Sequence, residues 1–547
     1  MNYLPLLDPL KENLDALYGE KGHFILNEIV RICSNNKANK VSFEYLDGPM
    51  LIAYPDNIRN DDEPTLFSLQ EVIRDWLPNS FQALHLLPFY PSTSDFGFAP
   101  INYLEVEPRF GQWNDIKHFS RTGRVMADLI LHHTSAKHPW FQKFLHDDPY
   151  YRDFYFVTEN PSDYSNVMKG RRLGMLTPFE SKTGFKNLFT RFGADQIDLN
   201  YRNPNVLIEL IRVIVEIINH GISIIRLDAI AYLWKEPLSS CVHLEQTTRI
   251  LSILRIVAAI INPKIVVIPE IDIEYYGKLY LKDNIDTPIA GYSFAFAPIL
   301  ISACLSGDVK KLANYLEIDS NNGNETQKIR FLATHDGLFL LPYAPVLSED
   351  ETQQLSHATR DAGGLVAHRP SDNLIYELNV PILDLLRNGS PFGEDRAAAC
   401  LFTLLSVQGI PAIFLNQLIA TPPDYQGIIK YGDPRAIVRG SLSSKEVGDL
   451  ISLRKPHVAR WLNMLKIRRS EPALKANSHM QIIYAQGGLL IIMRKINNRK
   501  LIALVNFGIK TVTTPEIFKG FSLLSKVNVS ISALSPCQFD WILIDSI

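Results

Sequence analysis

The chain alternates short apolar runs, rich in Ile, Val and Leu, with longer segments in which apolar residues recur every three or four positions. The first pattern is typical of buried parallel strands, and the second of the amphipathic helices that cover them. Eight runs predict strands, at Leu51–Tyr54, Ala83–Phe89, Val125–His132, Ile222–Asp228, Ile265–Glu270, Tyr292–Phe296, Ile329–Thr334 and Pro411–Leu415. Eight strands alternating with helices predict a closed (β/α)8 TIM barrel in the α/β class.

Segments that depart from the alternation predict the remaining parts. We expect an N-terminal helical extension at 1–45, the barrel at 46–138 and 201–475, an inserted subdomain at 139–200 and a C-terminal all-β domain at 476–547. The insertion is polar, rich in Tyr, Asn, Gly and Arg, and too long for a simple loop. The C-terminal part has short alternating runs without helical segments between them, which is typical of a β-sandwich or barrel.

Carboxylates stand at the ends of three predicted strands: Asp228, Glu270 and, just after the strand, Asp336. Strand ends are where a barrel of this kind keeps its active site. Arg226 shares a strand face with Asp228, so its charge is expected to keep that carboxylate ionised. Glu270 ends an apolar run, where partial burial is expected to raise its pKa. Taken alone, each is commonly structural, but together they offer the nucleophile and general acid/base of a retaining glycosyl transfer.

Composition narrows the classes of partner. The net charge of −3 argues against nucleic acid. The five cysteines are scattered without CxxC spacing, which favours a reducing, cytoplasmic location over disulfides or a zinc site, and the N-terminus has no signal-peptide pattern. The 20 uncharged residues from Pro288 to Gly307 are long enough for a membrane span, but their Gly, Pro and Ser favour a barrel strand leading into a helix. No motif for a nucleotide or metal is present, so no cofactor is expected.

The motifs ADLILHH, IIRLDA, VIPEI and LATHD, with DQIDLN, resemble the barrel-strand motifs of the α-amylase superfamily of glycoside hydrolases. The stretch LHLLPFYPSTSDFGFAPINYLEVEPRFGQWNDI, with THDGL, resembles the sucrose phosphorylase branch. The resemblance implies a glycosyltransferase that cleaves an α-glucoside with inorganic phosphate and releases α-glucose 1-phosphate. It assigns Asp228 as nucleophile, Glu270 as general acid/base and Asp336 as the carboxylate that grips the sugar. It also implies contacts to the glucosyl unit from Asp95, Phe98, His133, Arg226, His335 and Arg435, and to phosphate from Arg171, Arg172 and Tyr232.

Departures from the family pattern alter some of these expectations. His132 stands where amylases commonly have a calcium-holding Asn, so no metal is expected. Ile271 and Asp272 follow Glu270 where sucrose phosphorylases tend to have a histidine, and Ala436 and Val438 replace residues that usually follow the arginine. The N-terminal extension and LTPFE resemble the glucosylglycerate phosphorylases more closely.

Several alternatives stay open at this stage. The enzyme could be an α-glucosidase or transglucosidase with water or a sugar as acceptor. It could also be a catalytically inactive carbohydrate-binding protein, although the three intact carboxylates disfavour this. The aglycone (fructose, fructose 6-phosphate, glycerate or glycerol) and the oligomeric state are not determined by the sequence. We expect neither nucleic acid nor a membrane as partner.

Overall fold

The computed structural model describes residues 4–34, 45–168, 174–280, 289–321, 327–340, 347–370 and 372–544. The chain divides into two compact units. Unit 1 comprises residues 1–44, 86–292 and 369–373, and unit 2 comprises 45–85, 293–368 and 374–547. Arg171 and Arg172, the arginines assigned to phosphate, lie outside the described residues.

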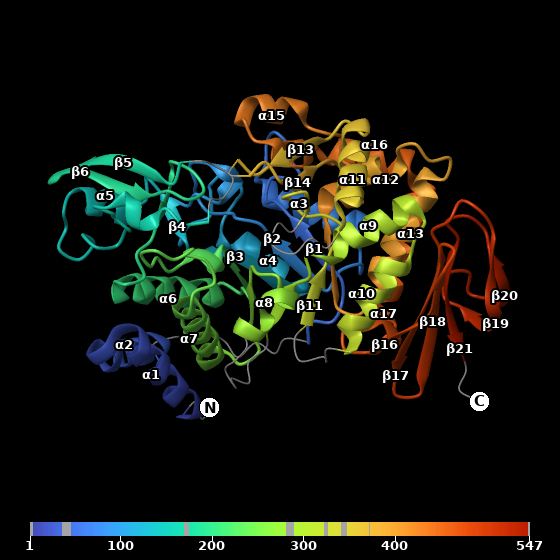
Figure 1. The fold of residues 1–547 in the computed structure, drawn as a ribbon, viewed down its shortest axis with the longest axis horizontal. Helices are drawn as coiled ribbons and strands as arrows, with labels where there is room; N and C mark the ends of the chain where they lie inside the picture. The colour runs from blue at the N-terminus through green and yellow to red at the C-terminus, as the bar shows by residue number, and fades with distance from the viewer. Residues whose placement is uncertain are drawn as a thin grey trace. The chain divides into compact units, whose positions relative to one another are not determined.

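One eight-stranded sheet forms the barrel (Figure 1), and its strands follow the order β10 (Ala290–Tyr292), β11 (Gln327–Arg330), β15 (Ile410–Phe414), β1 (Met50–Ala53), β2 (Ala83–Leu86), β3 (Arg124–Ile130), β8 (Ile224–Asp228) and β9 (Val266–Pro269). The paired registers are parallel, for example Asp128 of β3 beside Arg226 of β8. A parallel bridge between Val267 of β9 and Ile289, just before β10, joins the last strand of this order to the first. The predicted barrel is therefore confirmed.

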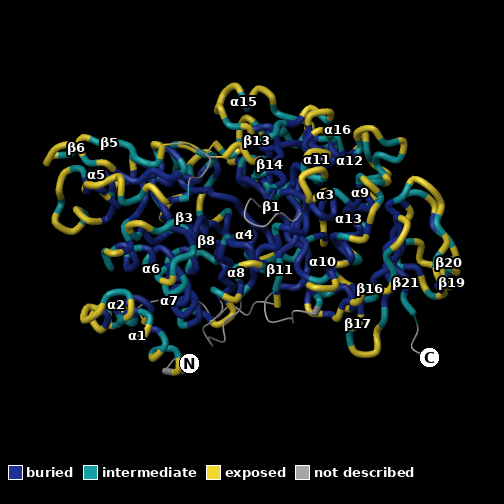
Figure 2. The backbone as a smooth tube through the Cα atoms, viewed as in Figure 1, coloured by how far each residue is buried: buried dark blue, intermediate teal, exposed yellow. Residues whose placement is uncertain are grey.

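Four barrel strands, β1, β3, β8 and β15, are buried along their whole length. The labelled segments β3 and β8 are dark blue in Figure 2. Strands of a parallel sheet are covered on both faces, which is why they read as continuous apolar runs in the sequence. The strand predicted at Tyr292–Phe296 was placed wrongly at its end, since β10 ends at Tyr292 and Phe296 begins a helix. An apolar run alone does not distinguish a strand from a buried helix.

Unit 1 carries two layers of helices. The N-terminal helices α1 (Leu4–Tyr18) and α2 (Gly22–Ser34) lie beside α7 (Glu245–Ile261) and α6 (Pro204–Asn219) respectively (Figure 1). Helix α6 begins after Asn203, whose side chain accepts a hydrogen bond from the backbone N–H of Asn205. The remaining helices of this unit are α4 (Trp113–Thr122), α5 (Pro139–Leu145) and α8 (Ile273–Tyr280).

The polar segment between β3 and α6 contains two antiparallel pairs of strands: β4 (His133–Ser135) with β7 (Gln196–Asp198), and β5 (Leu176–Ser181) with β6 (Gly184–Phe189). Its small core joins Phe156, Val167 and Phe189 to Cys241, which follows β8. The segment thus packs against the loop that follows the strand of Asp228.

Unit 2 contains the other barrel helices: α3 (Thr65–Trp76), α9 (Phe296–Ser306), α10 (Lys310–Asn321), α11 (Glu349–Asp361), α12 (Ile382–Arg387), α13 (Gly393–Ser406), α14 (Leu415–Leu418), α15 (Tyr425–Tyr431), α16 (Ser444–Leu453) and α17 (Lys455–Ser470). A small antiparallel sheet has the order β12 (Leu338–Phe339), β14 (Ile375–Asn379) and β13 (Leu365–His368). None of the helices within the described ranges is long and apolar enough to cross a membrane.

The C-terminal part of unit 2 is a six-stranded sheet of β16 (His479–Gln486), β17 (Leu489–Ile496), β18 (Arg499–Asn506), β19 (Val512–Ser522), β20 (Asn528–Leu534) and β21 (Phe539–Ile544). Its pairs are antiparallel, and its buried face includes Leu489, Ile491, Ile502 and Leu504. Leu490 and Ala503, which stand between them on the opposite face, are buried as well, so β17 and β18 are covered on both faces. The predicted all-β character of this part is confirmed.

Candidate active site

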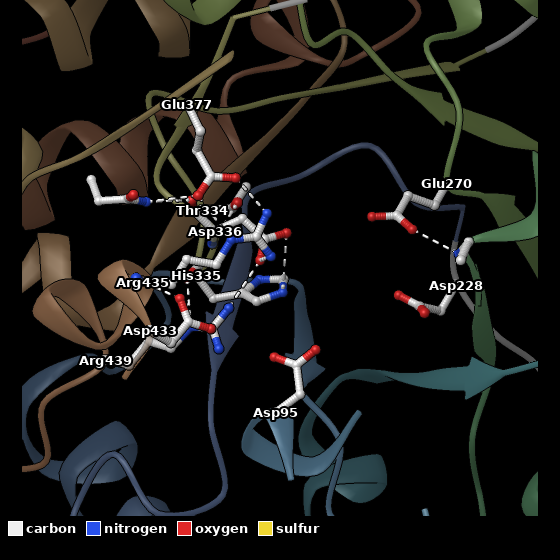
Figure 3. Close-up of polar contacts among 12 residues, drawn as sticks. Asp95, Asp228, Glu270, Thr334, His335, Asp336, Glu377, Asp433, Arg435 and Arg439 are labelled. Atoms are coloured by element: carbon white, nitrogen blue, oxygen red, sulfur yellow. Dashed lines mark hydrogen bonds and ion pairs between the residues drawn. The ribbon is translucent and has the colours of Figure 1, made fainter. Parts of the chain in front are cut away.

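Each unit contains a cluster of charged side chains around a carboxylate that ends or follows a barrel strand. The Asp228 cluster of unit 1 is Asp128, Arg226, Asp228 and Glu270, and the Asp336 cluster of unit 2 is His335, Asp336, Glu377, Arg435 and Arg439. Figure 3 shows the labelled members of both.

A single guanidinium organises the Asp228 cluster. Arg226 is buried, and its Nη1 donates to Asp228 Oδ1 at 2.8 Å and also to Asp128, while its Nη2 donates to Glu270. Asp128 reaches it because β3 and β8 pair in parallel with these two residues opposite one another. The three carboxylates and one guanidinium would carry a net charge of −2 if all were ionised, so the cluster favours keeping a proton.

The pKa of Asp228 reflects this balance. Burial raises the pKa of the Asp228 carboxyl well above its ordinary value, the negative charge of Glu270 raises it further, and Arg226 lowers it without cancelling the rise. The sequence had predicted that Arg226 would keep Asp228 ionised, and this interpretation was wrong because it counted the arginine but not the burial or the other carboxylates.

The backbone after β8 holds the second carboxylate in place. Ala229 adopts a left-handed conformation with φ of 51°, and its N–H donates to Glu270 Oε2 at 2.8 Å (Figure 3). The Glu270 N–H in turn donates to the carbonyl of Leu227 at 3.1 Å. Asp228 and Glu270 are therefore fixed to each other twice, through Arg226 and through the turn.

Unit 1 also contains His133, Phe98 and Asp95, which the sequence assigned to the sugar. His133 Nε2 lies 2.7 Å from the carbonyl oxygen of Phe98, and burial lowers the pKa of His133, so the ring is neutral at pH 7. The Phe98 ring lies 6.0 Å from the Arg226 guanidinium. Asp95 stands in a turn with φ of 51° and accepts a hydrogen bond from Gln196 at 3.1 Å. All three residues thus belong to the same unit as Asp228.

His132, which replaces the usual asparagine, is part of a buried network. Its Nε2 lies 3.1 Å from Asp198 Oδ2, and the Lys235 ammonium lies 2.8 Å from the same oxygen. Burial lowers the pKa of His132 to about 3, which leaves it neutral. Burial alone would raise the pKa of Asp198, but His132 and Lys235 outweigh it and lower that pKa. Among the described residues no group of three or more His, Cys, Asp or Glu side chains could hold a metal ion.

Two arginines converge on Asp336 in unit 2. Arg439 Nη2 donates to Asp336 Oδ1 at 3.0 Å, and Arg435 Nη1 donates to the same oxygen. His335 Nε2 lies 3.6 Å from Asp336 Oδ2 (Figure 3). Arg435, taken from a segment that departs from the family pattern, thus lies directly on the assigned carboxylate.

Glu377 of β14 completes the Asp336 cluster. It accepts a hydrogen bond from Arg435 Nε at 2.9 Å and a second from Arg435 Nη2. Asn379, two residues further along the strand, donates to Glu377 Oε1 at 2.9 Å and to the Asp336 carbonyl at 3.1 Å. Sequence analysis missed Glu377, Asn379 and Arg439. Only Arg439 carried a signal, since it follows Arg435 by one helical turn.

A tight turn places Asp336. Gly337 has φ of 91°, and a Cβ at this position would lie 2.6 Å from the carbonyl oxygen of Leu378. Only glycine tolerates both this conformation and this close approach. The pairing of β12 with β14 therefore begins directly after Asp336 and brings Glu377 and Asn379 to it.

Comparison with known proteins identifies the family. Residues 78–250 match the α-amylase catalytic domain. A glucosylglycerate phosphorylase of Allomeiothermus silvanus is 34% identical over 491 residues, covering 87% of this chain and 88% of that protein. The chain belongs to this phosphorylase family.

More distant members of the α-amylase superfamily resemble the chain as well. A sucrose phosphorylase of Streptococcus mutans is 26% identical, covering 85% of this chain and 96% of that protein. The crystal structure of sucrose 6F-phosphate phosphorylase from Thermoanaerobacter thermosaccharolyticum has the same fold, with a TM-score of 0.77, 22% identity, and coverage of 91% of this chain and all of that one. The chain thus resembles phosphorylases that are named for different glucosides, and it shares its fold with one of them.

Proposed function

We propose that the enzyme cleaves a glucosylglycerate-type α-glucoside with inorganic phosphate, and that it retains the anomeric configuration through a glucosyl-enzyme intermediate. The observation that carries the proposal is the pairing of Asp228 and Glu270 on one guanidinium, which holds the two carboxyl groups side by side. Retaining glycoside cleavage needs two closely spaced carboxyl groups in opposite protonation states.

The first step follows from this pair. Asp228 as carboxylate attacks C1 of the glucosyl unit, the bond from C1 to the glycosidic oxygen breaks, and Glu270 donates its proton to that oxygen as the aglycone leaves. This step requires an ionised Asp228 and a protonated Glu270, so the proton that burial favours on Asp228 in the free site must leave that carboxyl when the donor binds. Arg226 donates to both carboxyls and thereby offsets the charge on whichever is ionised.

The second step reverses the roles. A phosphate oxygen attacks C1, the ester bond to Asp228 breaks, and Glu270 takes the proton that the attacking phosphate oxygen loses. The product is α-glucose 1-phosphate, since two inversions at C1 restore the starting configuration. Asp336, paired with Arg435 and Arg439, is proposed to accept hydrogen bonds from sugar hydroxyls, and His133 and His335 are proposed to line the glucosyl unit.

Donor choice is proposed from the relatives. The glucosylglycerate phosphorylase is 34% identical and the sucrose phosphorylase 26% identical, so glycerate is favoured over fructose as the aglycone. We also propose a cytoplasmic location, because all five cysteines are free and buried, as in a protein kept in a reducing compartment.

The test is a panel of donors. Glucosylglycerate, glucosylglycerol and sucrose would each be incubated with the enzyme, with and without phosphate, and the products followed by an assay for glucose 1-phosphate and by proton NMR of the anomeric signal. We expect α-glucose 1-phosphate from glucosylglycerate only when phosphate is present. Free glucose at saturating phosphate would show a hydrolase, a β-anomer would exclude retention, and no turnover of any donor would favour the carbohydrate-binding alternative.

A further inference from the structure

Arg191 is a buried arginine that the proposed mechanism does not use. It lies between β6 and β7 with only 1% of its surface exposed. Its Nη2 donates to the carbonyl of Met168, whereas its Nε and Nη1 have no hydrogen-bond partner anywhere in the described ranges. A buried guanidinium with unused donors is costly, because its hydration is lost without replacement.

The nearby acid does not satisfy these donors. Asp198 Oδ1 accepts the backbone N–H of Arg191 at 3.2 Å rather than its side chain, and Asp198 Oδ2 faces Lys235 and His132. Since His132 is neutral, the buried charges of this network are Arg191, Lys235 and Asp198, which leaves one positive charge in excess. Such an excess favours an anion as the missing partner.

Arg191 also lies next to the loop that follows the nucleophile strand. Its guanidinium stacks over the ring of Tyr232 at 4.2 Å, and Tyr232 ends the short helical turn that begins two residues after Asp228. The neighbouring Phe192 ring lies 5.7 Å from Tyr232 and 5.6 Å from His133. Arg191 therefore lies beside Tyr232, which the sequence assigned to phosphate, and its neighbour Phe192 contacts His133, which the sequence assigned to the sugar.

We propose that Arg191 binds the oxyanion of a substrate at this site, with its free Nε–H and Nη1–H groups as donors. Carboxylate and phosphate oxygens share this chemistry, and planar arginine donors suit both. The inference rests on the proposed function for the identity of the anion, which is either the carboxylate of the acceptor acid or inorganic phosphate. A purely structural arginine would stabilise the fold but would not distinguish charged from neutral ligands.

Binding is tested first without turnover, so that its outcome does not depend on the proposed reaction. The thermal midpoint of the parent, Arg191→Met and Arg202→Met would be followed against inorganic phosphate, D-glycerate and glycerol. Arg202 is the matched control, since it also stacks on an aromatic ring, that of Trp234 at 5.5 Å, but is paired with Glu236 at 2.8 Å. Phosphate or glycerate, but not glycerol, should stabilise the parent and Arg202→Met and lose this effect in Arg191→Met. Equal stabilisation of all three proteins by both oxyanions would overturn the inference.

Steady-state kinetics then distinguish the two sources of the anion. Loss of charge-assisted hydrogen bonds should raise the KM of Arg191→Met about 10- to 100-fold. If the rise is in the KM for phosphate, Arg191 is a phosphate contact, and if it is in the KM for glycerate in the synthetic direction, with glycerol unaffected, Arg191 selects acidic acceptors. Where Arg191→Met fails to fold, Arg191→Lys retains the charge without the planar donors and should show the same split to a smaller degree. An unchanged KM for both oxyanions in the folded variant contradicts the proposal. A parent enzyme without any phosphorolysis would instead refute the proposed function, and the role of Arg191 would then be judged from the thermal-shift experiment alone.

Discussion

Replacing Asp228 by asparagine is expected to remove activity and, at the same time, to stabilise the protein. Asp228 is 7% exposed and shares one guanidinium with Asp128 and Glu270. Asparagine has nearly the same shape but carries no charge, so the repulsion among the carboxylates falls. Loss of the attacking carboxylate should lower kcat by several orders of magnitude.

The stability effect has a defined dependence on pH. Because the pKa of Asp228 in the folded state lies above its ordinary value of 3.8, the folded protein keeps a proton that the unfolded chain has lost. Between these two pKa values the free energy of unfolding of the parent falls by about 1.4 kcal/mol per pH unit, while the asparagine variant has no such term. The difference in free energy of unfolding between variant and parent should therefore grow in favour of the variant as pH rises above 3.8. This difference should become constant above the folded-state pKa of Asp228.

Calorimetry can resolve a change of this size. For cooperative unfolding of 547 residues at about 2.1 cal/mol/K per residue, the entropy of unfolding is about 1.1 kcal/mol/K, so each pH unit corresponds to about 1 °C in Tm. The Tm of parent and variant would be measured every half unit from pH 4 upward, with Asp449→Asn, an exposed aspartate of α16, as control. A Tm difference that stays constant or shrinks with rising pH would refute the charge argument, whatever happens to activity.

Two further substitutions test the ion-pair networks. Glu377→Gln removes the negative charge that faces the Arg435 guanidinium. Arg435 should then orient Asp336 less well, which should lower kcat/KM for the donor about 10- to 100-fold with little change in Tm. A variant with parental kinetics would show that Glu377 does not position Arg435. Lys235→Met leaves the Asp198 carboxylate buried without its cation. The free energy of unfolding should fall by about 3–5 kcal/mol, or the Tm by roughly 3–5 °C by the same conversion. A Tm within about 1 °C of the parent, on the order of measurement error, would contradict this pairing.

The fold could be predicted from the sequence wherever local pattern and topology agree. The strand predicted at Ile222–Asp228 is β8 (Ile224–Asp228), and it follows Gly221, whose φ of 97° favours glycine after a helix. At Tyr292–Phe296 the pattern did not predict the end of the strand, because β10 and the start of α9 are both buried and apolar on every face. Periodicity carries no information where every face is covered.

Parts of the candidate site could not be predicted because they depend on contacts between distant segments. The pairing of Asp128 with Arg226 follows from the parallel register of β3 and β8, and that of Arg435 with Glu377 from the position of β14. No local pattern distinguishes Glu377 from an ordinary strand glutamate. The strand-end carboxylates were visible because each is a charged residue that interrupts or ends an apolar run.

Charge balance within each cluster gives the acidic residues different tasks. Around Asp228, three carboxylates meet one guanidinium, and burial together with the neighbouring carboxylates raises the pKa of Asp228. Around Asp336, two carboxylates meet two guanidinium groups, so their formal charges balance. In the proposed mechanism the same residue types therefore serve acid/base chemistry and hydroxyl binding, and the number of arginines beside each carboxylate distinguishes the two clusters. It follows that Arg226→Met should release Asp228 and Glu270 together and lower kcat, because the guanidinium donates to both. Loss of Arg439 should instead raise the KM for the donor while leaving the contacts of the Asp228 cluster unchanged.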